Sequence, residues 1–166
     1  MWIVGFCSSL IYVFVYFQSK IYGYGALNIY YVAISMYGWY SWRYARQVDG
    51  KVTDLQISRI RISLALVLSA MFVVLYIGCG YALARFTDSP VPFYDALGTS
   101  LSIIATWMLA RKILEHWILW IFVNFFSAAL CFSQGLYPTA GLFVVYGIMS
   151  VVGWIKWKQS ILVVSG

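Results

Sequence analysis

Long apolar segments dominate the chain, and short stretches with charged residues, glycine or proline separate them. Most of these segments approach the roughly 20 residues that a helix needs to cross the hydrocarbon core of a bilayer. Six such helices take about 120 residues and leave only short loops between them. We therefore predict an all-α integral membrane protein with six transmembrane helices, at residues 2–17, 22–42, 62–84, 93–110, 117–133 and 137–155.

The composition supports a membrane location and argues against an enzyme. Of the 166 residues, 63% are apolar and 10% are charged, whereas soluble domains are about 25% charged. Glycine-rich phosphate loops, paired carboxylates and His-Glu-x-x-His patterns do not occur. The three cysteines fall on separate predicted helices, and His116, at a helix end, is interpreted as an interfacial imidazole. We expect no catalysis, no cofactor and no metal site.

The distribution of basic residues predicts the orientation of the chain. Lys and Arg number 11 against 5 acidic residues, a formal net charge of +6. If successive loops alternate across the bilayer, Lys20 and Arg85 lie on one side and the remaining nine on the other: Arg43, Arg46, Lys51, Arg59, Arg61, Arg111, Lys112, Lys156 and Lys158. The positive-inside rule makes that second side cytoplasmic. We predict a multi-pass protein of a bacterial-type inner membrane with both termini inside, and no nucleic-acid partner.

An internal repeat relates the second predicted helix to the sixth. At an offset of 115 residues, positions 20–43 share seven identities with positions 135–158, against about two expected by chance in so biased a composition. The shared Gly-Trp-x-x-Trp motif begins at Gly38 and at Gly153. Trp2 meets Trp117 at the same offset, which pairs the first helix with the fifth.

This repeat predicts a three-plus-one-plus-three arrangement of parallel repeats with its first helix missing. Residues 1–43 form an incomplete first repeat of two helices, and residues 44–61 form a basic cytoplasmic loop. Residues 62–85 form a linker helix that restores the direction of the chain, and residues 93–158 form the second three-helix repeat. We expect the chain to begin one helix late. Transporters with such repeats bind substrate near the bilayer midplane.

Neutral polar and aromatic side chains share faces of the predicted helices. An amide or phenol facing lipid would lose its hydrogen bonds, so these groups are expected to face the interior of the bundle. The candidate substrate-binding residues are Asn28, Tyr31, Trp39, Thr106, Trp107, Trp120, Asn124 and Tyr146. Two other interpretations stay open: the polar groups can be interhelical hydrogen-bonding residues, and the tryptophans an interfacial aromatic belt.

Charged residues are absent from the middle of the predicted spans, where a proton or ion relay would need one. A pocket of neutral polar and aromatic groups suits a neutral or singly charged solute with a ring, moving down its own gradient. Without energy coupling, net uptake then requires trapping inside the cell, for example by a kinase.

Several blocks in a consistent order resemble the PnuC family of vitamin-precursor transporters. They are residues 37–42 (YGWYSW), 107–112 (WMLARK), 117–120 (WILW), Asn124 and 135–140 (GLYPTA). The resemblance implies a seven-helix fold like that of the sugar-transporting SWEET proteins. It also implies facilitated uptake of nicotinamide riboside, followed by intracellular phosphorylation. The family's site would be carried by Trp120, Asn124 and Tyr146 in the second repeat and by Asn28, Tyr31 and Trp39 in the first.

The sequence leaves other functions open. Related branches of the family imply thiamine or riboflavin as the substrate, and a homo-oligomer is compatible with the sequence. A vitamin-binding subunit of an ATP-driven transporter would also have about six helices. A structural membrane protein would use the same polar residues only to hold its helices together.

Overall fold

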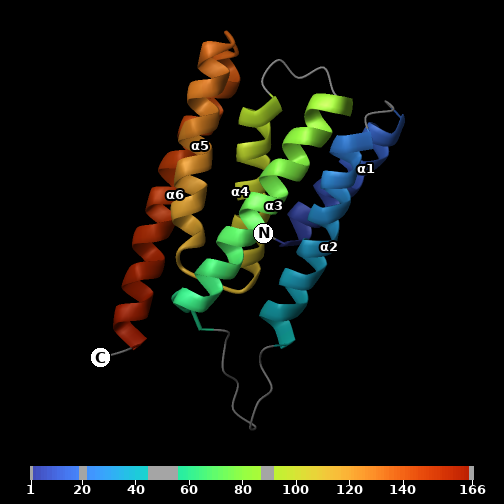
Figure 1. Cartoon of the computed structure of the whole chain (residues 1–166). Coiled ribbons are helices and arrows are strands. Elements are labelled where there is room, and N and C mark those ends of the chain that lie inside the picture. Colours follow the sequence, from blue (N-terminus) through green and yellow to red (C-terminus); the bar gives the residue numbers. More distant parts are fainter. Residues whose placement is uncertain (1, 19–21, 45–55, 87–91, 165–166) are drawn as a thin grey trace. The chain divides into compact units, whose positions relative to one another are not determined.

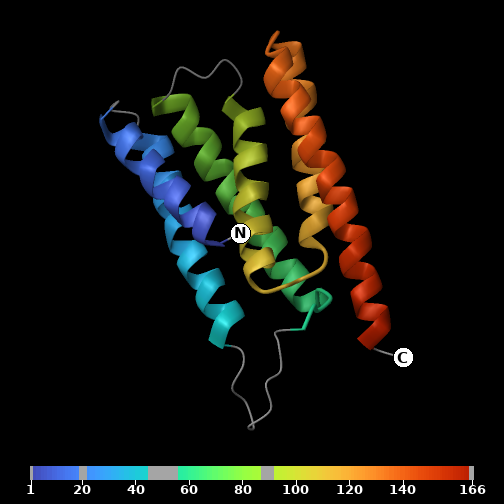
Figure 2. The same ribbon diagram turned by 180° about the vertical axis from the view of Figure 1, so that it is seen from behind.

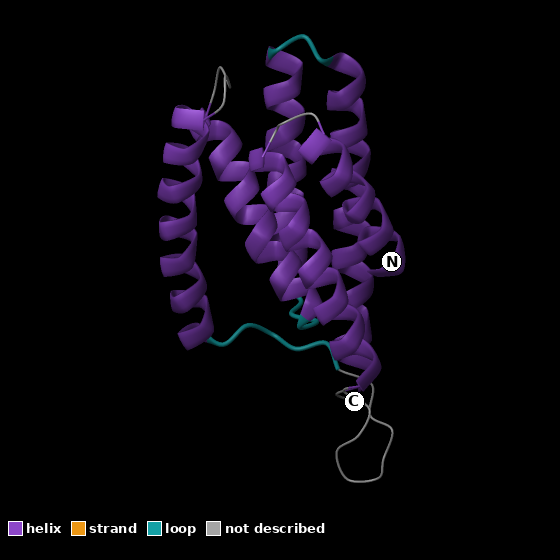
Figure 3. Ribbon diagram, turned by 90° about the vertical axis from the view of Figure 1, so that its right-hand side faces the viewer, coloured by secondary structure: helices purple, strands orange, loops and turns teal. Residues whose placement is uncertain are grey.

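The computed structural model describes residues 2–18, 22–44, 56–86 and 92–164, and these form six α-helices (Figures 1 and 3). The helices are α1 (Trp2–Gln18), α2 (Tyr22–Tyr44), α3 (Ile62–Phe86), α4 (Pro92–Ala110), α5 (His116–Ser133) and α6 (Tyr137–Val164). All six predicted helices are confirmed, with starts within one residue of the prediction. Lys20, Arg46, Lys51 and most of the predicted loop at 44–61 lie outside the described residues.

The end predicted for the last helix, at residue 155, is wrong, because α6 continues to Val164. The prediction ended the helix where Lys156 and Lys158 leave the apolar segment. Lysine and glutamine are good helix formers, so the helix continues after the sequence becomes polar. The Ser160 hydroxyl donates to the Lys156 carbonyl at 3.0 Å within this extension.

By length and composition, three of the described helices can cross a membrane: α3, α5 and residues Tyr137–Ile161 of α6. In α1 the apolar helical segment is Gly5–Phe14, which is shorter than these three candidate membrane spans. The described residues thus contain the six predicted helices, and the crossing of the bilayer by all six stays a prediction.

The chain divides into two compact units. The N-terminal unit comprises residues 1–56 and 109–112, and the C-terminal unit comprises residues 57–108 and 113–166. The N-terminal unit contains α1 and α2, and the C-terminal unit contains α3, nearly all of α4, α5 and α6.

In the N-terminal unit, α1 and α2 pack side by side in opposite directions (Figure 1, blue to cyan). The Trp2 ring lies on Gly38, where an added Cβ would be 2.5 Å from the ring. Trp42 meets the same ring edge-on, with centroids 5.5 Å apart. Trp42 also donates its indole N–H to the Ala110 carbonyl at 3.2 Å, and the Lys112 ammonium lies 4.7 Å from its ring centroid.

In the C-terminal unit, α5 and α6 lie side by side as a second helix pair (Figure 2, orange to red). The Trp117 ring lies on Gly153, again 2.5 Å from an added Cβ, and Trp157 meets Trp117 edge-on at 5.6 Å. We call these two sets the tryptophan–glycine clusters: Trp2, Gly38 and Trp42, and Trp117, Gly153 and Trp157. Their positions are related by the 115-residue offset found in the sequence.

The turn between α5 and α6 explains how the second pair forms. Gly135 has φ +76, the left-handed conformation that commonly ends a helix. Leu136 and Gly135 donate backbone N–H bonds to the carbonyls of Cys131 at 2.9 Å and Phe132 at 3.1 Å, a Schellman motif. Pro138 then lies in the first turn of α6, where proline is tolerated. The chain thus reverses within a few residues.

The other helices of the C-terminal unit pack through apolar side chains. Leu68 of α3, Ile104 and Met108 of α4, and Ile113 form a buried cluster. Phe93 of α4 lies against Gly80 of α3, 3.0 Å from where a Cβ would stand.

Replacing Gly153 by alanine is expected to destabilise the protein. Its Cβ would overlap the Trp117 ring, and overpacking of this kind costs about 1–3 kcal/mol. Gly141→Ala on the same helix is the control, because a Cβ there meets no atom within 4 Å. The melting temperatures of the detergent-purified variants measure this difference in stability, with size-exclusion chromatography as the readout of folded protein. Equal melting temperatures for the two variants would contradict the packing described.

Candidate functional site

Asn124 is the most deeply buried of the predicted site residues, at 5% exposure. Its side-chain Nδ2 donates to the Ser150 hydroxyl at 3.2 Å, and that hydroxyl donates to the Tyr146 carbonyl at 2.8 Å. An amide in an apolar helix needs such a partner, since an unbonded buried polar group costs several kcal/mol. The bond to Ser150 uses one of the two N–H groups of the amide. Ser150 was not among the residues predicted for the site, because a serine in an apolar helix gives no sign of its partner on another helix.

Trp120 and Tyr146 lie on the two helices that this hydrogen bond joins. Trp120 precedes Asn124 by one turn of α5 and is half-buried, so the two side chains lie on neighbouring positions of one helix face. Tyr146 precedes Ser150 by one turn of α6 and is 45% exposed. The structure thus places Trp120, Asn124 and Tyr146 on one helix pair, α5 and α6.

The two predicted residues of α4 have local packing partners. The Thr106 hydroxyl donates to the Ser102 carbonyl one turn earlier at 2.7 Å. Trp107 packs against the buried cluster of Leu68, Ile104, Met108 and Ile113. Both residues therefore contribute to the structure of the C-terminal unit, and a role in binding stays a prediction.

The three predicted residues of the N-terminal unit lie along α2. Asn28 and Tyr31 are half-buried, and the Tyr31 ring lies 5.6 Å from that of Tyr30. Trp39 is 43% exposed. One turn before Trp39, Ser35 is buried at 6% exposure, at the position equivalent to Ser150.

His116, interpreted from the sequence as an interfacial imidazole, lies at the first residue of α5 and inside the protein. Its side chain is fully buried at 0% exposure. The rings of Trp117 and Trp157 cover it, with centroids 4.6 and 4.9 Å away, and its Nδ1 lies 2.7 Å from the Ile113 carbonyl. The position of His116 at a helix end did not predict its burial, because the burial depends on Trp157 from another helix.

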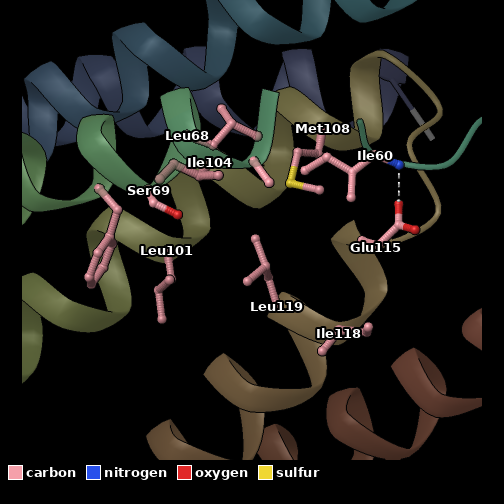
Figure 4. Close-up of a pocket in the computed structure, with 11 residues that line it drawn as sticks. Ile60, Leu68, Ser69, Leu101, Ile104, Met108, Glu115, Ile118 and Leu119 are labelled. Carbon is pink, nitrogen blue, oxygen red and sulfur yellow. Dashed lines mark hydrogen bonds between the residues drawn. The ribbon is translucent and has the colours of Figure 1, made fainter. Parts of the chain in front are cut away.

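A cavity of about 310 Å³ opens in the C-terminal unit between α3, α4 and α5 (Figure 4). None of the eight predicted site residues lines it. Its wall is almost entirely apolar, and Ser69 and Glu115 supply its polar side chains. Its residues looked like ordinary core positions in the sequence.

Apolar helices of spanning length that carry buried neutral polar groups are those of a multi-pass integral membrane protein. Residues 1–159 match the profile of the nicotinamide mononucleotide transporter family. The chain therefore belongs to this family of membrane transporters, which confirms the resemblance to PnuC proteins seen in the sequence.

Individual relatives and a solved structure agree with this family assignment. The nicotinamide riboside transporter PnuC of Escherichia coli (strain K12) is 24% identical over 170 residues, which cover 88% of this chain and 70% of the relative. The riboflavin/roseoflavin transporter RibM of Streptomyces davaonensis is 26% identical over 162 residues, covering 94% and 73%. The crystal structure of the vitamin B3 transporter PnuC superposes with a TM-score of 0.67 at 26% identity, covering 96% of this chain and 72% of that one.

Proposed function

We propose that the protein takes up nicotinamide riboside by facilitated diffusion. Phosphorylation by a cytoplasmic kinase then traps the nicotinamide riboside inside the cell. The observation that carries the proposal is the buried Asn124 amide, bonded across α5 and α6 to Ser150, in a chain of a vitamin-transporter family. The E. coli relative, a nicotinamide riboside transporter, supports this substrate.

The proposed site combines an amide with aromatic rings. Asn124 keeps one N–H group and its carbonyl oxygen for a polar substituent such as a carboxamide. Trp120, one turn away, offers a flat face on which a pyridine ring can stack. Tyr146 and Thr106 contribute hydroxyl groups, and Trp107 a further ring. In the N-terminal unit, α2 carries the same residue types at Asn28, Tyr31 and Trp39, whose part in binding stays a prediction.

The charge distribution of the described helices supports uncoupled transport. Arg85 lies in the last turn of α3 and Asp95 in the first turn of α4, so both are at helix ends. Within the described part of α5, the one ionisable group besides cysteine is His116, at its first residue. A proton or cation relay would need ionisable groups deeper in the helices.

We also propose the three-plus-one-plus-three, SWEET-like arrangement, with α3 as the linker. The two tryptophan–glycine clusters support it, because the same contact recurs at positions 115 residues apart in α1–α2 and in α5–α6. A linker helix between two parallel repeats crosses the bilayer once and restores the chain direction. The first repeat then ends at residue 43, and the second covers residues 93–158.

The orientation can be tested at the C-terminus. The basic residues predict a cytoplasmic end, so a C-terminal green fluorescent protein fusion is expected to fluoresce, and a C-terminal alkaline phosphatase fusion to be inactive. An active phosphatase and a dark fluorescent fusion would contradict the orientation.

Substitutions on α5 test the site. Asn124→Leu and Trp120→Ala are each expected to reduce ligand affinity more than tenfold while the protein still inserts, because they remove the amide and the stacking surface. Phe122→Ala, an exposed residue of the same helix, is the control for aromatic truncation. The measurement is titration calorimetry of the purified variants with nicotinamide riboside.

Ser150→Ala separates binding from helix packing. It removes the interhelical partner of Asn124 and leaves the amide in place, so it is expected to lower stability but to retain binding. Wild-type affinity in both Asn124→Leu and Trp120→Ala would show that these residues only join helices.

Riboflavin and thiamine are the alternative substrates. The similarity to RibM, a riboflavin/roseoflavin transporter, favours riboflavin as the second candidate. Calorimetric titration of the wild-type protein with nicotinamide riboside, thiamine and riboflavin is expected to give the tightest binding for nicotinamide riboside. Tighter binding of another vitamin would overturn the proposed substrate, and binding of none would favour a structural role.

A further inference from the structure

The cavity in the C-terminal unit is bounded by one face of each of three helices (Figure 4). On α3 its lining residues include Ala65, Leu68 and Phe72, spaced three and four apart and therefore on one face. Leu101 and Ile104 of α4 and Leu119 of α5 complete much of the wall. The volume, about 310 Å³, is at the lower limit of ligand pockets, which span about 300–1,000 Å³.

The wall chemistry does not suit a vitamin. Glu115 already accepts the backbone N–H of Ile60 through Oε2 at 2.9 Å, which leaves the Ser69 hydroxyl as the other side-chain polar group of the lining. A ribosyl or ribityl group would lose several hydrogen bonds to water without replacement in such a cavity. A hydrocarbon chain loses none.

The surroundings supply a hydrocarbon chain and a charge that attracts its headgroup. Next to the cavity, α3 exposes large apolar side chains such as Leu66 and Val67, at 67% and 54% exposure, which a spanning helix presents to lipid. Just before α3, exposed Arg59 and Arg61 flank Ile60 in the chain, and Ile60 lines the cavity. These two guanidinium groups outnumber the single Glu115 carboxylate, and arginine binds phosphate oxygens well.

We propose that this cavity binds an acyl chain of an anionic phospholipid, with the phosphate held by Arg59 and Arg61. The lipid fills the space between α3, α4 and α5 and thereby stabilises the C-terminal unit. This site is separate from the proposed vitamin site, because the two share no residue, and it does not depend on which vitamin is carried.

Photo-crosslinking of the full chain tests the proposal without any substitution. The protein is placed in vesicles of phosphatidylcholine that contain a little phosphatidylglycerol with a diazirine in one acyl chain. Labels are expected on the cavity face of α3 and α4, at residues such as Ala65, Phe72 and Leu101. An even spread of labels over exposed positions such as Val74 and Ile77, or the absence of labels from the cavity face, would overturn the proposal.

Filling the cavity provides a matched pair of variants. Ala65→Phe is expected to reduce labelling of the cavity at least fivefold, whereas Ala70→Phe, an exposed α3 residue outside the cavity, is expected to label normally. Equal labelling of the two variants would contradict the site. If Ala65→Phe fails to fold, unlabelled phosphatidylglycerol is added to the wild-type protein instead. Loss of the cavity labels would support the site, and unchanged labels would contradict it.

Competition also tests the headgroup contact. Phosphatidylglycerol is expected to displace the label at least fivefold better than phosphatidylcholine, and replacing Arg59 and Arg61 by glutamine is expected to abolish that preference. The control replaces Lys156 and Lys158, exposed on α6, by glutamine. Equal competition by the two lipids on the wild-type protein, or equal effects of the two double variants, would refute the role of the arginines.

Discussion

The contact of a tryptophan ring with a glycine sets the close spacing within each of the two helix pairs, α1 with α2 and α5 with α6. Lipid tails are as apolar as leucine, so helices in a bilayer associate through close packing and hydrogen bonds rather than through the hydrophobic effect. A glycine lets the large ring of Trp117 approach the backbone of α6 at Gly153. The Asn124 amide, two turns along α5 from Trp117, then meets the Ser150 hydroxyl one turn before Gly153 at 3.2 Å. A shift in register of one turn would separate this pair and leave the amide unbonded.

The same contact occurs twice, and its surroundings differ. In both clusters the first indole N–H is buried and has no hydrogen-bond partner among the described residues, so its ring contributes through packing. The second tryptophan has different neighbours in each unit. Trp42 bonds the Ala110 carbonyl and faces the Lys112 ammonium, whereas Trp157 meets the ring of His116 edge-on. The clusters therefore combine a common packing contact with distinct polar contacts.

Most of the helical architecture could be predicted from the sequence, because apolar length is a direct consequence of the thickness of the bilayer. The repeat also drew attention to Trp2, Trp117, Gly38 and Gly153 before their contacts were known. The α6 extension was missed because the end of an apolar segment does not require the end of a helix.

Features that depend on side chains from several helices could not be predicted in the same way. The burial of His116 depends on Trp157, 41 positions later in the chain. The cavity of the C-terminal unit is lined mainly by residues of α3, α4 and α5 that look like ordinary core positions in the sequence. Of the candidate site, the sequence indicated the residue types and the polar face, but the bond between Asn124 and Ser150 required the register of α5 and α6.

Uptake of radiolabelled nicotinamide riboside into liposomes that contain only the purified chain tests the central claim most directly. The proposed mechanism predicts saturable entry without ATP, a kinase or an ion gradient, until the concentrations inside and outside are equal. A kinase and ATP enclosed in the liposomes should then convert this equilibration into accumulation. Entry that requires a partner ATPase, or accumulation above the external concentration by the chain alone, would contradict facilitated diffusion.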